Sequence, residues 1–274
     1  MQVRQLPVLN PFLQPYIDYY YILSTEADTR PATYLAFPSN NVPVCFFRNC
    51  RISLYPQKAI VKKQDAGKLS AIIVGNAVHP VSVCMGPGIK EFCIVFKPPG
   101  LNCMVDKKLG TTLSATFSAT NLFPECRENI ELILDGQENL EALERQLVAR
   151  VHLSPELRSL QQVIAILEKK EEPQSFGTIA GEIFISYKTI YRLFKAHLGT
   201  SPVQFRHLVK FRQAVNNTKK KSYTRKMTKM ALDSGYYDQS NLVNEFKKIA
   251  GHTPANFIKA VTLVADKRIA WKFE

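Results

Sequence analysis

The sequence lacks the motifs of the common enzyme classes and of membrane proteins. It has no glycine-rich nucleotide loop, no G-x-S-x-G and no H-E-x-x-H, which argues against nucleotide-dependent enzymes, serine hydrolases and zinc proteases. No apolar run reaches about 18 residues, and no secretory signal peptide is recognisable. We therefore expect a soluble, cytoplasmic protein that is not an enzyme, has no catalytic residues and does not bind membranes.

Metal-binding patterns are also scarce. Residues 1–150 contain a single histidine, His79, whereas a metal site built on histidine needs a cluster of histidines and carboxylates. All six cysteines lie between Cys45 and Cys126, and no two form a C-x-x-C pair. This spacing argues against a zinc site. We expect no cofactor and no metal, and buried reduced thiols; whether the cysteines sense redox state stays open.

Positive charge is abundant, and it is concentrated in one part of the chain. The net charge is +13, and residues 175–274 hold 18 Lys and Arg against 6 Asp and Glu, whereas residues 1–174 hold 18 against 17. A basic segment of this kind is typical of proteins that bind the phosphate backbone of nucleic acids. The run Lys219–Lys221 alone would be better explained as a solvated basic surface.

The basic segment contains an internal repeat. The pattern F-K-x-x-x-G-x-x-P occurs from Phe194 to Pro202 and again from Phe246 to Pro254. Each glycine can take the left-handed conformation that ends a helix, and each proline prevents the helix from continuing. The repeat therefore predicts two copies of one helical module.

Each copy is predicted to be a short helix, a tight turn and a second helix. In the first copy Ile179 and Ala180 mark the first helix, and Ser186 caps the second. In the later copy the first helix covers about residues 226–234, and Asp238 caps the second, whose apolar face is formed by Leu242 and its i+4 and i+7 neighbours. A small alanine at the crossing lets the two helices approach closely. This is the geometry of a helix-turn-helix.

Residues from about 158 to 262 resemble the DNA-binding domain of the AraC/XylS family of bacterial transcription regulators. The matching residues are Ile179-Ala180, Ser186, Ile190, Arg192-Leu193-Phe194-Lys195, Gly199, Ser201-Pro202, Met230-Ala231, Gly235-Tyr236, Asp238-Gln239-Ser240, Phe246-Lys247, Gly251 and Thr253-Pro254-Ala255. The resemblance implies seven helices in two subdomains, joined by a long helix over about residues 202–217. Two recognition helices would then enter successive major grooves about 34 Å apart on one face of the DNA.

The resemblance also implies which side chains contact DNA. The expected base-reading residues are Lys188, Thr189, Tyr191, Arg192, Gln239, Ser240, Asn241 and Asn244. The expected phosphate contacts are Ser186, Lys195, Arg206, Lys210 and Lys247. The chemistry agrees, because Arg and Lys can bond guanine O6 and N7, and Gln and Asn can bond adenine N6 and N7.

Three positions depart from the family pattern. Phe184 stands where the first turn usually has glycine, although phenylalanine adopts positive φ only at a cost. Asn244 stands where the second recognition helix usually offers arginine. The long helix usually ends in a leucine pair, whereas here Asn216-Asn217-Thr218 leads into Lys219–Lys221. We therefore expect the second half-site to be read more weakly, with phosphate contacts supplying more of the affinity.

The first half of the chain indicates a β domain. Alternating apolar residues at 69–74, 81–85 and 92–96, separated by glycine and proline, predict an antiparallel sandwich or barrel that extends to about residue 105. The overall fold class is thus α+β. A helix then carries Leu140, Leu143 and Leu147 on one face, which either packs on the sandwich or pairs two protomers.

This half is also similar, more faintly, to the cupin-like domain that precedes some AraC-type DNA-binding domains. The similarity lies in Leu13-x-x-Tyr16-Ile17-x-x-Tyr20, Phe37-Pro38 and Val95-Phe96-Lys97-Pro98. It implies that residues 1–150 bind an effector or dimerise, ahead of a DNA-binding domain at residues 158–265.

Two functional hypotheses follow. The first is a sequence-specific transcription regulator, with the family resemblance favouring an activator. Its partners are double-stranded DNA and RNA polymerase, and a small-molecule effector and a homodimer stay open. The second is a protein whose helix-turn-helix pair no longer reads DNA and whose first domain binds a small molecule or a protein.

Overall fold

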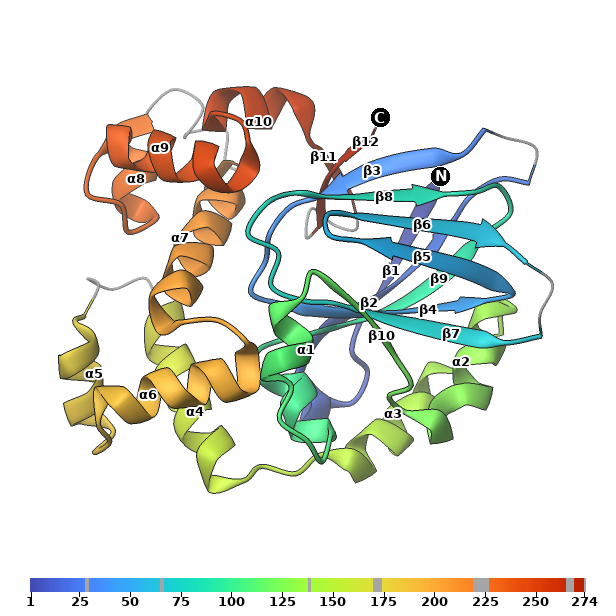
Figure 1. Ribbon diagram of the computed structural model, residues 1–274, viewed down its shortest axis with the longest axis horizontal. Helices are drawn as coiled ribbons and strands as arrows, with labels where there is room; N and C mark the ends of the chain where they lie inside the picture. Colours follow the sequence, from blue (N-terminus) through green and yellow to red (C-terminus); the bar gives the residue numbers. More distant parts are fainter. Residues whose placement is uncertain are drawn as a thin grey trace.

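Two six-stranded sheets packed face to face form the first part of the molecule (Figure 1). The computed structural model describes residues 1–27, 30–64, 67–137, 139–169, 174–218, 227–264 and 269–273. The first sheet has the order β1 (Gln2–Leu6), β2 (Ile17–Ser24), β9 (Lys90–Phe96), β4 (Val42–Arg48), β7 (Leu69–Val74), β10 (Phe117–Thr120). The second has the order β11 (Thr262–Val264), β12 (Ile269–Phe273), β3 (Ala32–Ala36), β8 (Val81–Met85), β6 (Lys58–Lys63), β5 (Cys50–Tyr55). Among the described strands β6 and β8 pair in parallel, and the other pairs are antiparallel.

The strands predicted at residues 69–74, 81–85 and 92–96 are confirmed as β7, β8 and the main part of β9. Strand β9 is buried at every position except Lys90. Its run Glu-Phe-Cys-Ile-Val-Phe shows little polar alternation because one face meets the second sheet and the other meets helices.

The sheets extend beyond the range in which the sequence indicated strands. Strand β10 follows residue 105, and β11 and β12 come after all the helices. Strand β12 pairs with β3, and Trp271 stacks on Tyr34 with ring centroids 4.2 Å apart. The division expected from the sequence, into residues 1–150 and 158–265, leaves β12 out. Strand pairing between distant segments produces no local periodicity, so the sequence did not reveal this strand.

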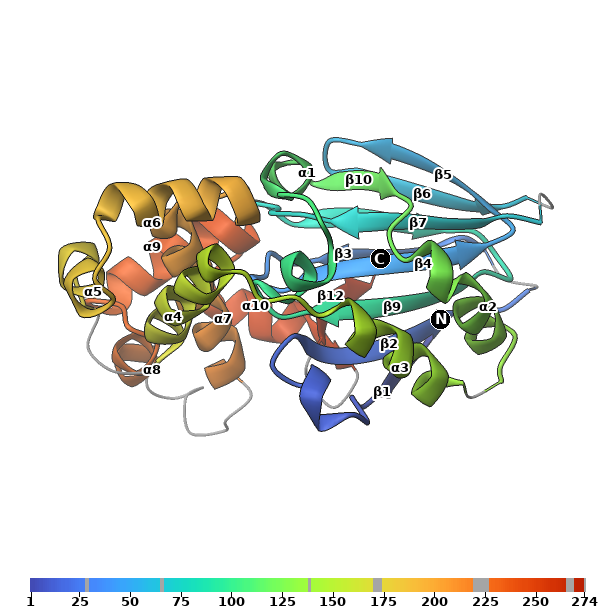
Figure 2. The ribbon, with the colours of Figure 1, turned by 90° about the horizontal axis from the view of Figure 1, so that it is seen from below.

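Helices cover the face of the first sheet that points away from the second (Figure 2). They include α2 (Arg127–Leu134) and α3 (Leu140–Arg150). Leu143 and Leu147 of α3 are fully buried in the core on this face, so the leucine stripe packs on its own domain. Between them Glu144 is also buried, and its carboxylate accepts hydrogen bonds from Asn10 N at 2.6 Å and Tyr20 Oη at 3.1 Å.

Short helices complete this part of the chain. They are η1 (Pro11–Leu13), η2 (Gly100–Met104), α1 (Gly110–Ser114) and η3 (Pro124–Cys126). Within the described residues, no helix is both long enough and apolar enough to cross a membrane.

The remaining helices follow α3, and all of them except α4 lie in the basic segment, residues 175–274. In the region that the structure describes they are α4 (Pro155–Glu168), α5 (Phe176–Glu182), α6 (Tyr187–Leu193), α7 (Pro202–Thr218), α8 (Met227–Asp233), α9 (Gln239–Ala250) and α10 (Pro254–Ala260). A π-helical turn, η4 (Phe194–Leu198), continues α6. Helix α7 is the long helix expected over residues 202–217, and the run Lys219–Lys221 lies outside the described residues.

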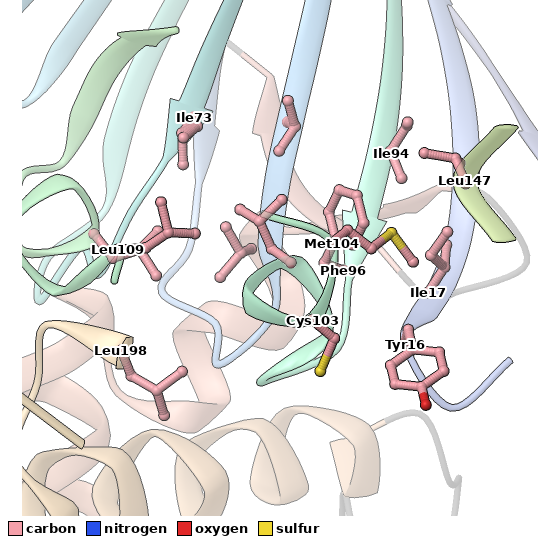
Figure 3. Close-up of a cluster of buried hydrophobic side chains, with 14 of the residues drawn as sticks. Tyr16, Ile17, Ile73, Ile94, Phe96, Cys103, Met104, Leu109, Leu147 and Leu198 are labelled. Atoms are coloured by element: carbon pink, nitrogen blue, oxygen red, sulfur yellow. The ribbon is translucent and has the colours of Figure 1, made fainter. Parts of the chain in front are cut away.

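One apolar core connects the first sheet to the helices beside it. It contains residues of the sheet, of α2 and α3, and of α4 to α7. Figure 3 shows part of this cluster, where Leu198 of η4 joins Leu109 and Phe96. A second core fills the space between the two sheets. A third holds α7 to α10 together and includes Phe37, whose ring lies 4.7 Å from that of Phe257.

Side chains of the β domain cap the end of η4. Asn102 Nδ2 donates to the carbonyl of His197 at 2.9 Å, and Asn76 Nδ2 donates to that of Leu198. Gly110 packs so closely that a Cβ there would lie 2.1 Å from the Lys195 carbonyl oxygen. The last carbonyls of a helix have no partner within the helix, so these contacts fix the position of α6 relative to the sheets.

Candidate nucleic-acid interface

The first helix-turn-helix consists of α5 and α6. Ser175 caps α5 by accepting a bond from Thr178 N at 3.0 Å, and Ser186 caps α6 by accepting one from Thr189 N at 3.1 Å. The N-cap predicted at Ser186 is therefore confirmed. Ile179 and other buried apolar residues of both helices pack in the first core, so one face of α6 is fixed inward and the opposite face is presented to solvent.

The turn between these helices is strained at Phe184. Its φ is +55°, and the residue is 95% exposed. The position that resembled a glycine site in the sequence does require a left-handed backbone. A residue with a Cβ pays about 1–2 kcal/mol for that conformation, and the exposed ring gains no packing in return.

The second helix-turn-helix consists of α8 and α9. Asp238 caps α9 by accepting a bond from Asn241 N at 2.7 Å, as predicted. Gly235 ends α8 with φ of +76°. Glu245 Oε2 lies 2.8 Å from His207 Nδ1, which links α9 to α7.

Each recognition helix presents the predicted base-reading residues to solvent, and α6 and α9 lie at opposite ends of α7 (Figure 1). Thr189 is half-buried, and its hydroxyl lies 3.0 Å from that of Ser186. The seven others are exposed, namely Lys188, Tyr191, Arg192, Gln239, Ser240, Asn241 and Asn244. Gln239 Oε1 also accepts a bond from Thr228 of α8 at 3.3 Å.

Arg192 is held by a carboxylate that sequence reasoning missed. Glu156, at the start of α4, lies 3.3 Å from Arg192 Nη1, 3.0 Å from Lys108 Nζ and 3.2 Å from His197 Nε2. Hydrogen bonds from Lys108 and then His197 lower the pKa of Glu156. Burial lowers the pKa of His197 below its usual value. The guanidinium expected to read guanine therefore has an internal partner, and Lys108 connects this group to the β domain.

The predicted phosphate contacts fall into two groups. Ser186, Lys195 and Lys247 are exposed, and Lys195 Nζ lies 5.9 Å from the centre of the Tyr191 ring. Arg206 and Lys210 of α7 are half-buried.

Both of these α7 cations have contacts inside the protein. Arg206 donates to the carbonyl of Gln174 at 2.8 Å, and its guanidinium lies 3.8 Å from the Phe176 ring centre. Lys210 Nζ lies 5.9 Å from the ring centre of Tyr236. Burial lowers the pKa of both cations, and Arg206 lowers that of Lys210 further. They line a cleft of about 670 Å³ between the two helix-turn-helix units.

The described residues contain one cluster of side chains with metal-ligand spacing, formed by Cys45, Glu91 and Cys93. It lies between the sheets beside a small interior cavity, away from the recognition helices.

A comparison with known families agrees with the helix-turn-helix units. Residues 179–260 match the model of a family described as "Helix-turn-helix domain". No curated protein sequence is significantly similar to the chain.

Several solved structures are similar. An AraC-type regulator from Chromobacterium violaceum is 22% identical over 36% of this chain and 88% of its own, with a TM-score of 0.34. The DNA-binding domain of AdpA in complex with target DNA is 25% identical over 37% and 91%, with a TM-score of 0.35. ToxT from Vibrio cholerae is 11% identical over 94% and 97%, with a TM-score of 0.46.

The family match covers both units described above, from Ile179 of α5 to the end of α10. Residues 179–260 therefore form a helix-turn-helix domain that contains both units.

Proposed function

We propose that the protein is a sequence-specific transcriptional activator that places α6 and α9 in two successive major grooves. The observation that carries this proposal is the arrangement of two capped helix-turn-helix units at opposite ends of α7, each with a polar solvent face. Both units lie in a segment with a charge excess of +12. Such an excess releases counterions from DNA and makes binding salt-dependent.

The two helices read DNA by different chemistry. On α6 the guanidinium fork of Arg192 bonds guanine O6 and N7, with Lys188 and Tyr191 beside it, whereas α9 offers the amides of Gln239 and Asn244 to adenine. A bidentate pair contributes about 1–3 kcal/mol of discrimination against the wrong base. Because α9 has no charged reader among these positions, α6 dominates specificity.

Phosphate contacts position the protein without reading sequence. We assign them to Lys195 and Lys247, which are exposed at the ends of the two recognition helices, and to the first turn of α6 beside Ser186. Arg206 and Lys210 act from within the cleft by adding positive potential, because their side chains already contact the protein.

The β domain regulates this interface, and RNA polymerase is the expected partner of the DNA-bound protein. Side chains of the β domain contact η4 directly, so a change in the sheets can reach α6. The cavity between the sheets has a volume of about 120 Å³, well below the roughly 300–1,000 Å³ of sites for organic ligands. An effector that binds there without opening the sheets is therefore very small.

A genome-wide map of bound sites, followed by binding to one mapped duplex at several salt concentrations, tests the proposal. Affinity should fall steeply with salt. Arg192→Ala should relax specificity at one or two base pairs by about tenfold or more. Asn244→Ala should relax it less, and Lys247→Ala should weaken binding to all sequences alike. Salt-independent binding, or the reverse ranking of Arg192 and Asn244, would contradict it.

A further inference from the structure

The core between the sheets contains a group of polar side chains on three adjacent strands. Cys45 of β4 and Cys93 of β9 are direct cross-strand partners, and Tyr21 of β2 is the partner of Cys93 on its other side. Glu91 lies two residues before Cys93 on β9, so both side chains point to the same face. The strand register therefore brings two thiols, a carboxylate and a phenol together among apolar neighbours.

The ligand atoms of this group converge. Cys45 Sγ lies 3.4 Å from Cys93 Sγ, and one atom each of Cys45, Glu91 and Cys93 lie within 4.8 Å of one another. Tyr21 Oη donates to Glu91 Oε1 at 2.6 Å and lies 3.8 Å from Cys45 Sγ. Glu91 is 1% exposed, and its second oxygen, Oε2, is buried without a hydrogen-bond partner. Leaving a buried oxygen without a partner is costly, and a ligand would relieve that cost.

A small cavity of about 120 Å³ between the sheets reaches the edge of the group, because Tyr21 and Cys45 line it. That volume is about four times the share of one water molecule in the liquid, which leaves room for an ion and a coordinated water.

We propose that Cys45, Glu91 and Cys93 form a binding site for a thiophilic divalent cation, with Zn²⁺ the best match. Two thiolates and a carboxylate are ligands that zinc accepts, and water from the cavity supplies the fourth. Two sulfurs bound to one tetrahedral zinc at about 2.3 Å lie about 3.8 Å apart. The two sulfurs here need to separate by only a few tenths of an ångström.

A disulfide between the same cysteines fits less well. It would require the sulfurs to approach from 3.4 Å to about 2.05 Å.

The sequence argued against zinc because no C-x-x-C pair is present. The site does not need one, because residues 45 and 91–93 become neighbours through the pairing of β4 with β9. The second sheet covers the site, and Trp271 of β12 contacts the Tyr21 ring with centroids 5.7 Å apart.

The test is a titration of the reduced full-length chain with Co²⁺, followed by displacement with Zn²⁺. We expect one Co²⁺ per chain, with a near-ultraviolet thiolate-to-metal charge-transfer band that one Zn²⁺ abolishes. The fluorescence of Trp271, the single tryptophan, should change with the same stoichiometry. Cys93→Ser should remove the band, whereas Cys103→Ser, which changes a buried cysteine of the other core, should retain it.

Glu91→Gln keeps the shape of the carboxylate and provides the measurement if the cysteine variants do not fold, as judged by circular dichroism. Glu91→Gln should lower the affinity for Co²⁺ about tenfold or more, because even replacing a residue that only supports a metal ligand costs at least about that much. The proposal is overturned by the absence of a band in the reduced parent chain. A full band in folded Cys93→Ser, or unchanged affinity in Glu91→Gln, overturns it as well.

Discussion

An ion pair with Glu156 restrains Arg192, the residue expected to read guanine. Replacing Glu156 should therefore strengthen DNA binding. Its carboxylate contacts Arg192, Lys108 and His197 at 3.0–3.3 Å. Glu156→Gln keeps the shape and the hydrogen-bonding capacity of the side chain and removes its charge. Arg192 is then free to reach DNA, and one negative charge beside the phosphate backbone is lost.

The size of the effect follows from exposure. The side chains of Arg192 and Glu156 are 62% and 36% exposed, and ion pairs of this kind contribute about 0.2–1 kcal/mol. Affinity for the mapped site should therefore rise by up to about fivefold. The gain should shrink as salt increases, because exposed charges are screened.

Fluorescence anisotropy with a labelled duplex at two salt concentrations measures this change. Glu131→Gln is the matched control, since Glu131 pairs with Arg127 at 3.0 Å on α2, far from the recognition helices. In an Arg192→Ala background the gain from Glu156→Gln should largely disappear. If Glu156→Gln leaves affinity unchanged at both salt concentrations, or if the gain is as large without Arg192, Glu156 does not restrain this residue.

Three further predictions concern stability, each measured by denaturant unfolding. Phe184→Gly should raise the free energy of unfolding by up to about 1 kcal/mol, since it relieves a left-handed backbone at an exposed residue; Phe184→Ala keeps the Cβ, and an equal gain there would refute the strain. Leu143→Ala should lower the free energy of unfolding by about 2–5 kcal/mol because Leu143 is fully buried. A loss below about 1 kcal/mol would contradict the packing of Leu143 in the core. His197 has a lowered pKa in the folded chain, so the unfolded chain binds more protons below about pH 6.5 and stability should fall on acidification. His197→Gln should make that fall shallower, and an unchanged slope would show that other groups cause it.

The helix-turn-helix units could be predicted because their signals are local. A serine or aspartate cap, a glycine at the helix end and a following proline act within a few residues. The structure places Ser186 and Asp238 as caps and gives Gly199 and Gly251 φ values of +69° and +72°. The strained turn at Phe184 was visible for the same reason, because the requirement for positive φ belongs to a single position.

The contacts between distant segments could not be predicted from the sequence. Glu156 belongs to no motif in the sequence, and its contact with Lys108 depends on how the helices pack on the sheets. The meeting of Cys45 with Glu91 and Cys93 depends on strand register. In both cases the signal is spatial, and one sequence without a structure does not contain it in readable form.

The pairing of β12 with β3 has a consequence for synthesis of the chain. Ala36 and Trp271 are register partners, so the second sheet can be completed only after the residues between them have left the ribosome. At about 5–20 residues per second that interval is roughly 10–50 s. The helix-turn-helix units emerge within it, and they can form before the second sheet is complete because their caps and turns depend on local contacts. During that time the unpaired edge of β3 can pair with other chains. The β domain is therefore begun first but completed after the helix-turn-helix domain.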